Sequence, residues 1–264
     1  MCVLGDAICS HCGAAWTLDD GASTTPLSTL GRVLYSSGSR AQRMSRSPKQ
    51  SQVLVYQDVL CPWSWLAEMR LVPLQRELAD VFRFVSRPYP LRPMESLPSE
   101  EEIARALRDL EDAAREPEAL PLRAELWTSG DPPRSTVEPL AALEAARLQG
   151  ESARVELQTR LRHAALEQGL NVTRPDVVFE LAARSGLQMN RFSAAFGSPQ
   201  TRRLIREEHR LARGRGVRRV PTLVIASRWM ISGVRETAEY RDLLLACVGK
   251  LERARTPVLE RLVH

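Results

Sequence analysis

Strand-type sequence occurs in two groups separated by a long helical stretch, and this order constrains the fold more than any other feature of the chain. In the first group, Val53–Val59 and Val81–Tyr89 are rich in β-branched and apolar residues, as buried strands are. Between them, Ser64–Ala79 places leucine and methionine at helical spacing. These segments predict a β-α-β unit whose strands are parallel and joined by a right-handed crossover.

The second group consists of Val220–Ala226 and Arg228–Gly233, which we expect to pair as an antiparallel hairpin. A last helix follows, and Cys247 falls on its apolar face, where a packing role is expected. Residues 99–213 show helical periodicity interrupted by glycine and proline. Because both strand groups can join one sheet, the order predicts an α/β fold with an inserted helical subdomain.

The chain is basic, with a formal net charge of +5, and its lysine and arginine residues are all arginine except Lys49 and Lys250. The densest cluster, Arg213–Arg219, contains no aromatic residue, whereas segments that bind single strands stack bases on aromatic rings. We therefore interpret this cluster as a solvated loop and expect no nucleic-acid partner. No apolar run reaches the length of a membrane span, so no membrane association is expected.

The five cysteines are odd in number and scattered, which argues against a disulfide framework and for a reducing compartment. The first residues lack a secretory-signal pattern, so a cytoplasmic location is expected. Residues 1–50 have the composition of a disordered extension. This segment contains Cys2, Cys9, His11 and Cys12, which are zinc-type ligands. No second C-x-x-C pair follows, so we favour uninvolved thiols and expect no metal site.

Cys61 is the residue whose placement suggests chemistry. It lies between the end of the first predicted strand and the start of the first predicted helix, in the sequence DVLCPWSWLA. The free N–H groups and the dipole at a helix N-terminus favour negative charge, and such positions lower a thiol pKa from about 8.5 to roughly 3.5–7.5. Spacing alone leaves two interpretations open: a reactive thiolate, or a buried and inert cysteine.

The Val220–Pro221 pair opens a strand in which proline cannot donate a ladder hydrogen bond. An X-Pro bond can be cis, which would turn the Val220 backbone toward the end of the first strand, or it can be an ordinary trans bond at a sheet edge. Arg218 and Arg219 precede this pair. They are interpreted as solvated side chains, with stabilisation of a thiolate or an anionic substrate as the alternative.

Three stretches together resemble the thioredoxin-fold DsbA family, especially its cytoplasmic FrnE-like branch. DVLCPWSWLA is similar to the branch's strand-to-helix active site, which has Cys-Pro-Trp-Cys. LRHAALEQGLNVTRPDVVFELAARSGL resembles the inserted helical block, and ARGRGVRRVPTLVIASRWMISGVRETAEYRDLL resembles the closing segment with its cis-proline loop, hairpin and last helix. The resemblance covers about residues 52–250. It implies a thioredoxin-like domain over residues 51–254, followed by a tail at residues 255–264.

The resemblance implies a role for each residue of the site. Cys61 would be the nucleophile of a thiol–disulfide oxidoreductase, acting on protein or small-molecule thiols and disulfides. Pro221 would be the cis proline facing it, and Val220 would offer backbone hydrogen bonds to a substrate. Trp63, which with Pro62 adjoins the sulfur, would tune and shield it. No tightly bound cofactor is expected.

The sequence departs from the family at Ser64, which replaces the second cysteine. Cys61 therefore cannot close a local disulfide, and a mixed disulfide at Cys61 would be resolved by glutathione or another low-molecular-weight thiol. Ser64 would donate a hydrogen bond to the thiolate. The resemblance thus implies monothiol exchange in place of dithiol oxidation.

Two alternatives remain open. Kappa-class glutathione transferases and 2-hydroxychromene-2-carboxylate isomerases share this fold and carry Ser-Pro-Tyr-Ser, so the fourth position here is similar to theirs. They also tend to carry Gly-x-Asp-Arg after the hairpin, where this chain has Gly233-Val234-Arg235-Glu236. We rank that interpretation below the DsbA-like one. The second alternative is a redox-inactive module that keeps the groove for a partner.

Overall fold

The computed structural model describes residues 50–255, with side chains through residue 251. The elements in chain order are β1 (Ser51–Gln57), α1 (Pro62–Glu77), β2 (Phe82–Pro88), α2 (Glu100–Ala113), α3 (Glu125–Thr128), α4 (Val137–Arg147), α5 (Glu151–Arg162), the π-helix η1 (His163–Glu167), α6 (Pro175–Arg184), α7 (Met189–Gly197), α8 (Pro199–Gly214), β3 (Thr222–Ile225), β4 (Trp229–Ser232) and α9 (Thr237–Arg255). The predicted extension at residues 1–50, with its four zinc-type ligands, lies outside the described residues except for Gln50. The tail predicted from residue 255 lies outside them after Arg255.

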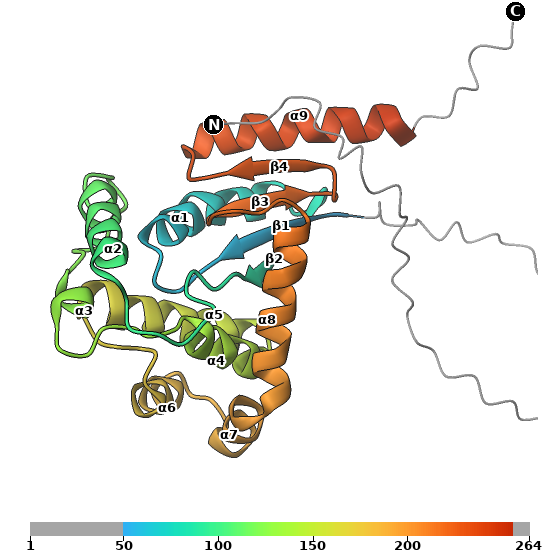
Figure 1. Ribbon diagram of the computed structural model, residues 1–264. Helices are drawn as coiled ribbons and strands as arrows, with labels where there is room; N and C mark the ends of the chain where they lie inside the picture. The colour runs from blue at the N-terminus through green and yellow to red at the C-terminus, as the bar shows by residue number, and fades with distance from the viewer. Residues whose placement is uncertain (1–49, 256–264) are drawn as a thin grey trace, which may run out of the picture.

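The strands form one four-stranded sheet in the order β2-β1-β3-β4 (Figure 1). β1 and β2 are parallel, with Val53 opposite Phe84, and α1 makes the crossover between them. β3 runs antiparallel to both β1 and β4. The predicted parallel pair and the predicted hairpin are both confirmed, and the two strand groups do share one sheet.

The alternation of side chains along β1 divides the core of this sheet into two faces, because successive strand residues point to opposite sides. Val53 and Val55 pack on one face against residues of α1 and α9, including Leu74 and Cys247. Cys247 is therefore a core residue, as predicted. Leu54 and Tyr56 pack on the other face, in a cluster with Cys61, Tyr89, Ala212, Val217, Val220 and Val224. We call this set the thiol cluster.

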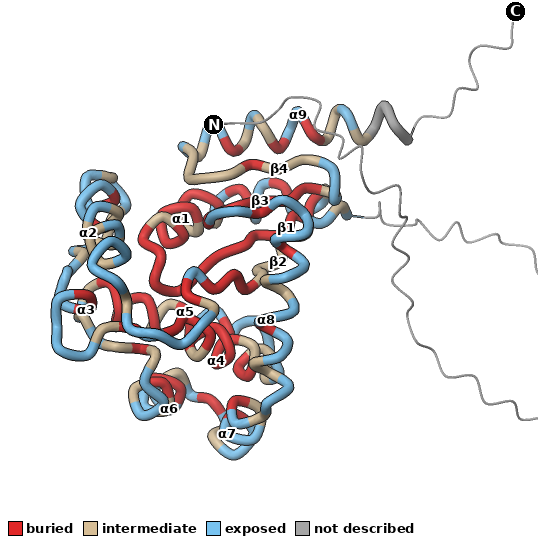
Figure 2. Tube along the Cα trace, in the orientation of Figure 1, coloured by how far each residue is buried: buried red, intermediate tan, exposed pale blue. Residues whose placement is uncertain are grey.

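The segment between β2 and β3 forms a helical block, which confirms the predicted insertion (Figure 1). Its centre is α4, which contacts α5, α6, α7 and α8. Figure 2 shows buried chain along the central strands β1 and β3, along α4 and in much of α1, and exposed chain along the outer helices. Alanines such as Ala142 and Ala146 are fully buried in α4, and their small side chains let neighbouring helices approach closely. Among residues 50–255, no helix is both long and apolar enough to cross a bilayer.

Candidate active site around Cys61

Cys61 is the N-cap residue of α1, and the helix begins at Pro62. The helix was predicted to begin at Ser64, but proline is well suited to the first helical position because that position needs no N–H donor. The N–H groups of Ser64 and Trp65 donate to the Cys61 carbonyl at 3.1 and 3.3 Å. The predicted placement of the cysteine at the junction of strand and helix is thus correct.

The cis-proline loop lies directly against the thiol. The Val220–Pro221 peptide bond is cis, the alternative that the resemblance implied. The Cys61 thiol donates to the carbonyl oxygen of Val220, with 3.8 Å between Sγ and the oxygen. These two residues are separated by 159 positions in the sequence, and the pairing of β1 with β3 brings them together. Cys61, Pro62, Ser64, Val220 and Pro221 therefore form one buried constellation.

Ser64 lies one turn into α1 and is buried with its hydroxyl near the sulfur. Its side chain and its backbone N–H both hydrogen bond to the Cys61 sulfur, which favours the ionised thiol. The Ser64 hydroxyl oxygen also accepts from the backbone N–H of Asp58 at 3.5 Å. Ser64 thus occupies the place where it can hydrogen bond to the sulfur, as the sequence suggested.

The expected lowering of the Cys61 pKa is wrong. Burial raises the pKa of the Cys61 thiol to about 11, and only 5% of the residue is exposed. The hydrogen bonds from Ser64 act in the opposite direction but are outweighed, and the negative charges of Asp58 and Asp109 raise the pKa further. The position at a helix N-terminus does not produce a thiolate here, because the apolar thiol cluster disfavours the charged form.

Trp63 covers the site from the side of the helical block. Its ring is half-buried and packs against both the thiol cluster and the core of the helical block. Its indole N–H donates to Oδ1 of Asp109 on α2 at 3.0 Å. Asp109 therefore holds Trp63 in place and also brings a carboxylate near the sulfur. Asp109 was not predicted, because in the sequence it is one of many charged residues in a helical stretch.

Asp58 is the second residue that the sequence analysis missed. It is fully buried, and its two oxygens accept from the backbone N–H groups of Leu60 and Leu91 at 2.8 Å each. Burial raises the pKa of Asp58 to about 6, despite these bonds, the Thr136 side chain and the charge of Arg162. An aspartate that ends a buried strand, three residues before a cysteine, is a signal that the sequence does contain.

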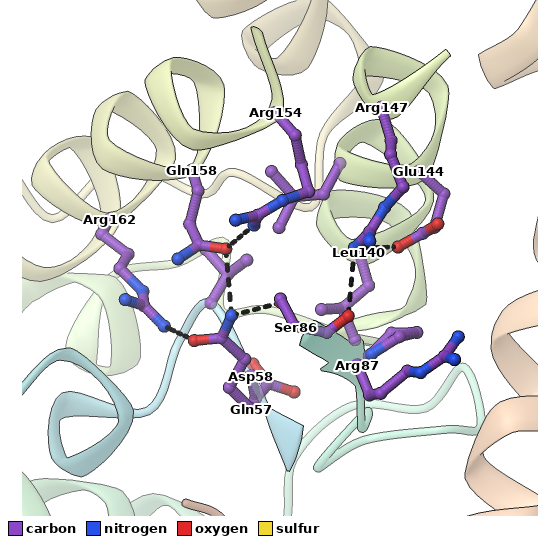
Figure 3. A pocket seen from close by; sticks show the side chains of 13 residues that line it. Gln57, Asp58, Ser86, Arg87, Leu140, Glu144, Arg147, Arg154, Gln158 and Arg162 are labelled. Atoms are coloured by element: carbon purple, nitrogen blue, oxygen red, sulfur yellow. Dashed lines mark hydrogen bonds and ion pairs between the residues drawn. The ribbon is translucent and has the colours of Figure 1, made fainter. Parts of the chain in front are cut away.

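A polar network lies behind Asp58, on the side of β1 that faces the helical block (Figure 3). The Arg162 guanidinium donates to Gln57 Oε1 at 2.7 Å and also pairs with Glu68. Gln158 receives a hydrogen bond from Gln57 at 3.2 Å. Gln57, Gln158 and Arg162 line a small cavity between β1, β2, α4 and α5, and neither Glu68 nor Cys61 is part of its lining.

Two histidines of the helical stretch have partners within the fold. His163 bonds to Glu167 one turn along its own helical segment, and His209 packs edge-on against Tyr89, so both have packing or pairing partners. In residues 50–255, no group of three or more His, Cys, Asp or Glu side chains is arranged to hold a metal ion. Cys61 and Cys247 are the free cysteines of the described chain.

Comparison with known proteins places this site in a family context. A curated relative, the ClpXP adapter protein SpxH of Halalkalibacterium halodurans, is 28% identical over 186 residues, which cover 67% of this chain and 58% of the relative. The chain thus matches little more than half the length of that relative.

Two solved structures share the fold. A candidate protein disulfide isomerase from Nitrosomonas europaea matches with a TM-score of 0.69 and 16% identity, over 76% of this chain and 99% of that one. The cytosolic disulfide reductase DsbM of Pseudomonas aeruginosa, solved with GSH, matches with a TM-score of 0.56 and 18% identity, over 75% and 98%. The model of the DSBA-like thioredoxin domain matches residues 52–244, which is well over half of the chain. The protein therefore belongs to the DSBA-like thioredoxin domain family.

Proposed function

We propose that this protein is a thiol–disulfide oxidoreductase of the FrnE-like type that works with one cysteine. One observation carries the proposal: Cys61 is the N-cap residue of α1, and its sulfur lies 3.8 Å from the carbonyl oxygen of Val220, which precedes a cis proline. This arrangement presents a sulfur and a backbone acceptor side by side, as exchange with an extended substrate requires. Pro62, Trp63 and Ser64 complete the sulfur's surroundings, and Val220 and Pro221 form the facing edge.

The proposed cycle is mixed-disulfide exchange. Ionised Cys61 attacks one sulfur of a substrate disulfide, the Cys61–substrate bond forms, and the other sulfur leaves as a thiolate. Because the fourth position is Ser64, a second thiol from solution must then attack the mixed disulfide and release Cys61. Glutathione or another low-molecular-weight thiol is proposed for this step, and the GSH present in the DsbM structure supports that choice. The cytosolic description of DsbM likewise supports a cytoplasmic location.

The protonation of Cys61 sets the expected rate. With a pKa of about 11, roughly one thiol in ten thousand is ionised at pH 7. Exchange should therefore be slow near neutral pH and should accelerate about tenfold per pH unit up to the pKa of Cys61.

The test is the rate of alkylation of Cys61 against pH, followed by mass spectrometry after treatment with oxidised glutathione. We expect a glutathione adduct on the peptide that carries residue 61, and its absence from Cys61→Ala. Ser64→Cys should add dithiol oxidase activity, because the new sulfur would lie where the Ser64 hydroxyl now bonds to Cys61. Failure of Cys61 to form any adduct, even at pH 10, would count against the proposal.

A redox-inactive binding module is the second candidate, and the burial of Cys61 favours it. The thiol is almost inaccessible to solvent and is protonated at neutral pH. The adapter function named for the SpxH relative supports a partner-binding role of this kind. This candidate predicts binding to a partner that is unchanged by Cys61→Ala.

The transferase or isomerase interpretation has less support. In the segment after the hairpin, Arg235 pairs with Glu239 at 3.0 Å and Glu236 pairs with Arg70 at 3.1 Å. These side chains are engaged within the protein, at the positions where kappa-type enzymes tend to carry the Asp and Arg of their glutathione motif. Turnover of an electrophile with glutathione that survives Cys61→Ser would favour this interpretation.

A further inference from the structure

Four arginines surround the loop that leads from α8 to β3: Arg213, Arg215, Arg218 and Arg219. All four are exposed. In the part of the chain that the structure describes, none of them forms an ion pair with a carboxylate, although Arg202 and Arg210 on the same helix pair with Glu138 and Glu207. We call these four residues the arginine rim. It is a concentration of positive charge that internal pairing does not neutralise.

The rim borders the thiol cluster. Val217 and Val220, which flank Arg218 and Arg219, are both buried in the cluster with Cys61. The carbonyl oxygen of Val220, 3.8 Å from the sulfur, belongs to the residue that directly follows Arg219. Arg215 donates to the hydroxyl of Tyr56, another member of the cluster, at 2.8 Å.

Three hydrogen bonds hold this part of the rim in place. The Arg218 guanidinium donates to the carbonyl oxygens of Arg213 and Val217, at 2.5 and 3.3 Å, which satisfies acceptors at the end of α8. Arg219 has its carbonyl oxygen bonded by the Thr222 hydroxyl at 2.7 Å. The backbone that carries the rim is thus tied to the cis-proline loop.

The charges on the other sides of Cys61 are negative. Asp58 and Asp109 both raise the thiol pKa, and the arginine rim lies on the loop whose Val220 carbonyl faces the sulfur. The positive charge of the rim would attract a substrate that carries carboxylates. A substrate that brings cations would meet repulsion from the rim.

We propose that the arginine rim makes Cys61 selective for small disulfides that carry carboxylates close to the sulfur. This inference rests on the proposed exchange function and adds the substrate class to it. The burial of Cys61 supports a small reactant, because only 5% of the residue is exposed and Trp63 lies beside it. Carboxylates on such a molecule can pair with guanidinium groups in bidentate geometry.

The exchange reaction needs no reactant other than Cys61, the substrate disulfide and solvent. The Cys61 proton is lost to solvent, and the thiolate attacks one sulfur of the disulfide. The S–S bond of the substrate breaks as the new S–S bond at Cys61 forms, and the released thiolate takes up a proton from solvent. The substrate is reduced to one free thiol, and Cys61 is oxidised to the mixed disulfide.

The test compares three small disulfides of different charge: dianionic 5,5′-dithiobis(2-nitrobenzoate), neutral 2,2′-dithiodipyridine and dicationic cystamine. The rate at residue 61 is the rate of the intact chain minus the rate of Cys61→Ala. Dividing this difference by the rate of the same probe with the urea-unfolded chain gives the normalised rate. At low salt, we expect the normalised rate of the dianion to exceed that of the dication by about 10–100-fold, and 0.5 M salt to remove most of this preference.

Arg219→Glu should lower the normalised rate of the dianion by about tenfold and leave that of the neutral probe within about twofold. The matched control is Arg228→Glu, the same change of charge in the exposed turn at the other end of β3. An unchanged neutral-probe rate also shows that the variant is folded.

The outcomes separate the two proposals. Equal normalised rates for all three probes, or equal losses in Arg219→Glu and Arg228→Glu, would overturn the rim's selectivity while leaving exchange at Cys61 intact. A disulfide in an acidic peptide that reacts faster than the small dianion would overturn the assignment to small molecules. No adduct at residue 61 with any probe, the neutral one included, would defeat both proposals.

Discussion

At the end of β1, the two faces of the strand lie in surroundings of very different polarity. Tyr56 points into the thiol cluster, where Cys61 is surrounded mainly by apolar side chains. Gln57 points the other way, toward the buried guanidinium of Arg162 (Figure 3). Arg162 in turn pairs with the carboxylate of Glu68. One strand thus separates an apolar environment from a charged one at adjacent positions.

The difference shows what determines the state of the thiol. On the network side, the buried guanidinium has hydrogen-bonding partners and a carboxylate, which offset the cost of its burial. On the thiol side, Ser64 is the main group that favours the ionised form, and burial outweighs it. A helix N-terminus alone is therefore insufficient to hold a thiolate against the cost of burial.

The largest predicted change is a loss of folding stability, caused by a substitution in the polar network around Arg162. Arg162→Met removes a cationic side chain that is 1% exposed, and it leaves Glu68 without its ion-pair partner and Gln57 Oε1 without its donor. Breaking a buried pair in this way typically costs about 3–5 kcal/mol. Unfolding in urea, followed by circular dichroism, should show a loss of this size.

Arg160→Met is the matched control, two positions earlier on α5. Its guanidinium is 41% exposed and pairs with Glu156 in the i,i+4 arrangement. Exposed pairs contribute about 0.2–1 kcal/mol, so this variant should be nearly as stable as the original chain. Equal losses in the two variants would show that the network is not specially stabilising.

The second effect concerns Asp58, which lies at the boundary of the two sides. Its pKa is raised from 3.8 to about 6 in the folded chain, so the folded state holds this proton more tightly than the unfolded state does. Its contribution to stability is therefore greatest below pH 4 and is lost as the pH rises through 6. The shift corresponds to about 3 kcal/mol.

The measurement is the free energy of unfolding of the original chain minus that of Asp58→Asn, from pH 4 to pH 7. Subtracting the variant cancels most other titrating groups. We expect this difference to fall by about 2.5 kcal/mol over this range with increasing pH, since part of the shift is already expressed at pH 4. A difference that is constant, or that grows with pH, would contradict the raised pKa.

The fold could be predicted from the sequence because its signals are local. The β-branched and apolar run of Val53–Val59, the breaks at proline and glycine, and the helical spacing near Cys247 each depend on neighbouring residues. The junction at Cys61 and the hairpin follow from the same signals. The cis bond before Pro221 needed the resemblance, since a proline at the start of a strand is compatible with either isomer.

The properties of the site could not be predicted in this way, because they depend on residues that are distant in the sequence. Val220 and Asp109 reach the Cys61 site from 159 and 48 positions away. Arg162 looks in the sequence like one more charged residue of a helix, and only the packing of α5 against β1 buries it behind Asp58. The pKa of Cys61 is set by this packing, so the local rule for helix N-termini gave the wrong direction.

A third effect tests the thiol side directly. Ser64→Ala removes the hydroxyl that favours ionised Cys61, so the Cys61 pKa should rise by about one further unit. Alkylation of Cys61 by iodoacetamide between pH 8 and 10 should then be about tenfold slower, after subtraction of the Cys61→Ala rate. An unchanged or faster rate would show that the hydroxyl does not favour the thiolate.

The smallest predicted effect tests whether Asp109 acts on Cys61 through its negative charge or through its hydrogen bond to Trp63. Asp109→Asn removes the negative charge but keeps an oxygen that can accept the indole N–H of Trp63. The Cys61 pKa should fall slightly, and alkylation below pH 10 should be about threefold faster. Asp112→Asn, on the same helix but paired with Arg115 at the surface, should leave the rate unchanged. Asp109→Ala also frees Trp63, so a much larger increase in that variant would mean that Cys61 is restrained more by the covering ring than by charge.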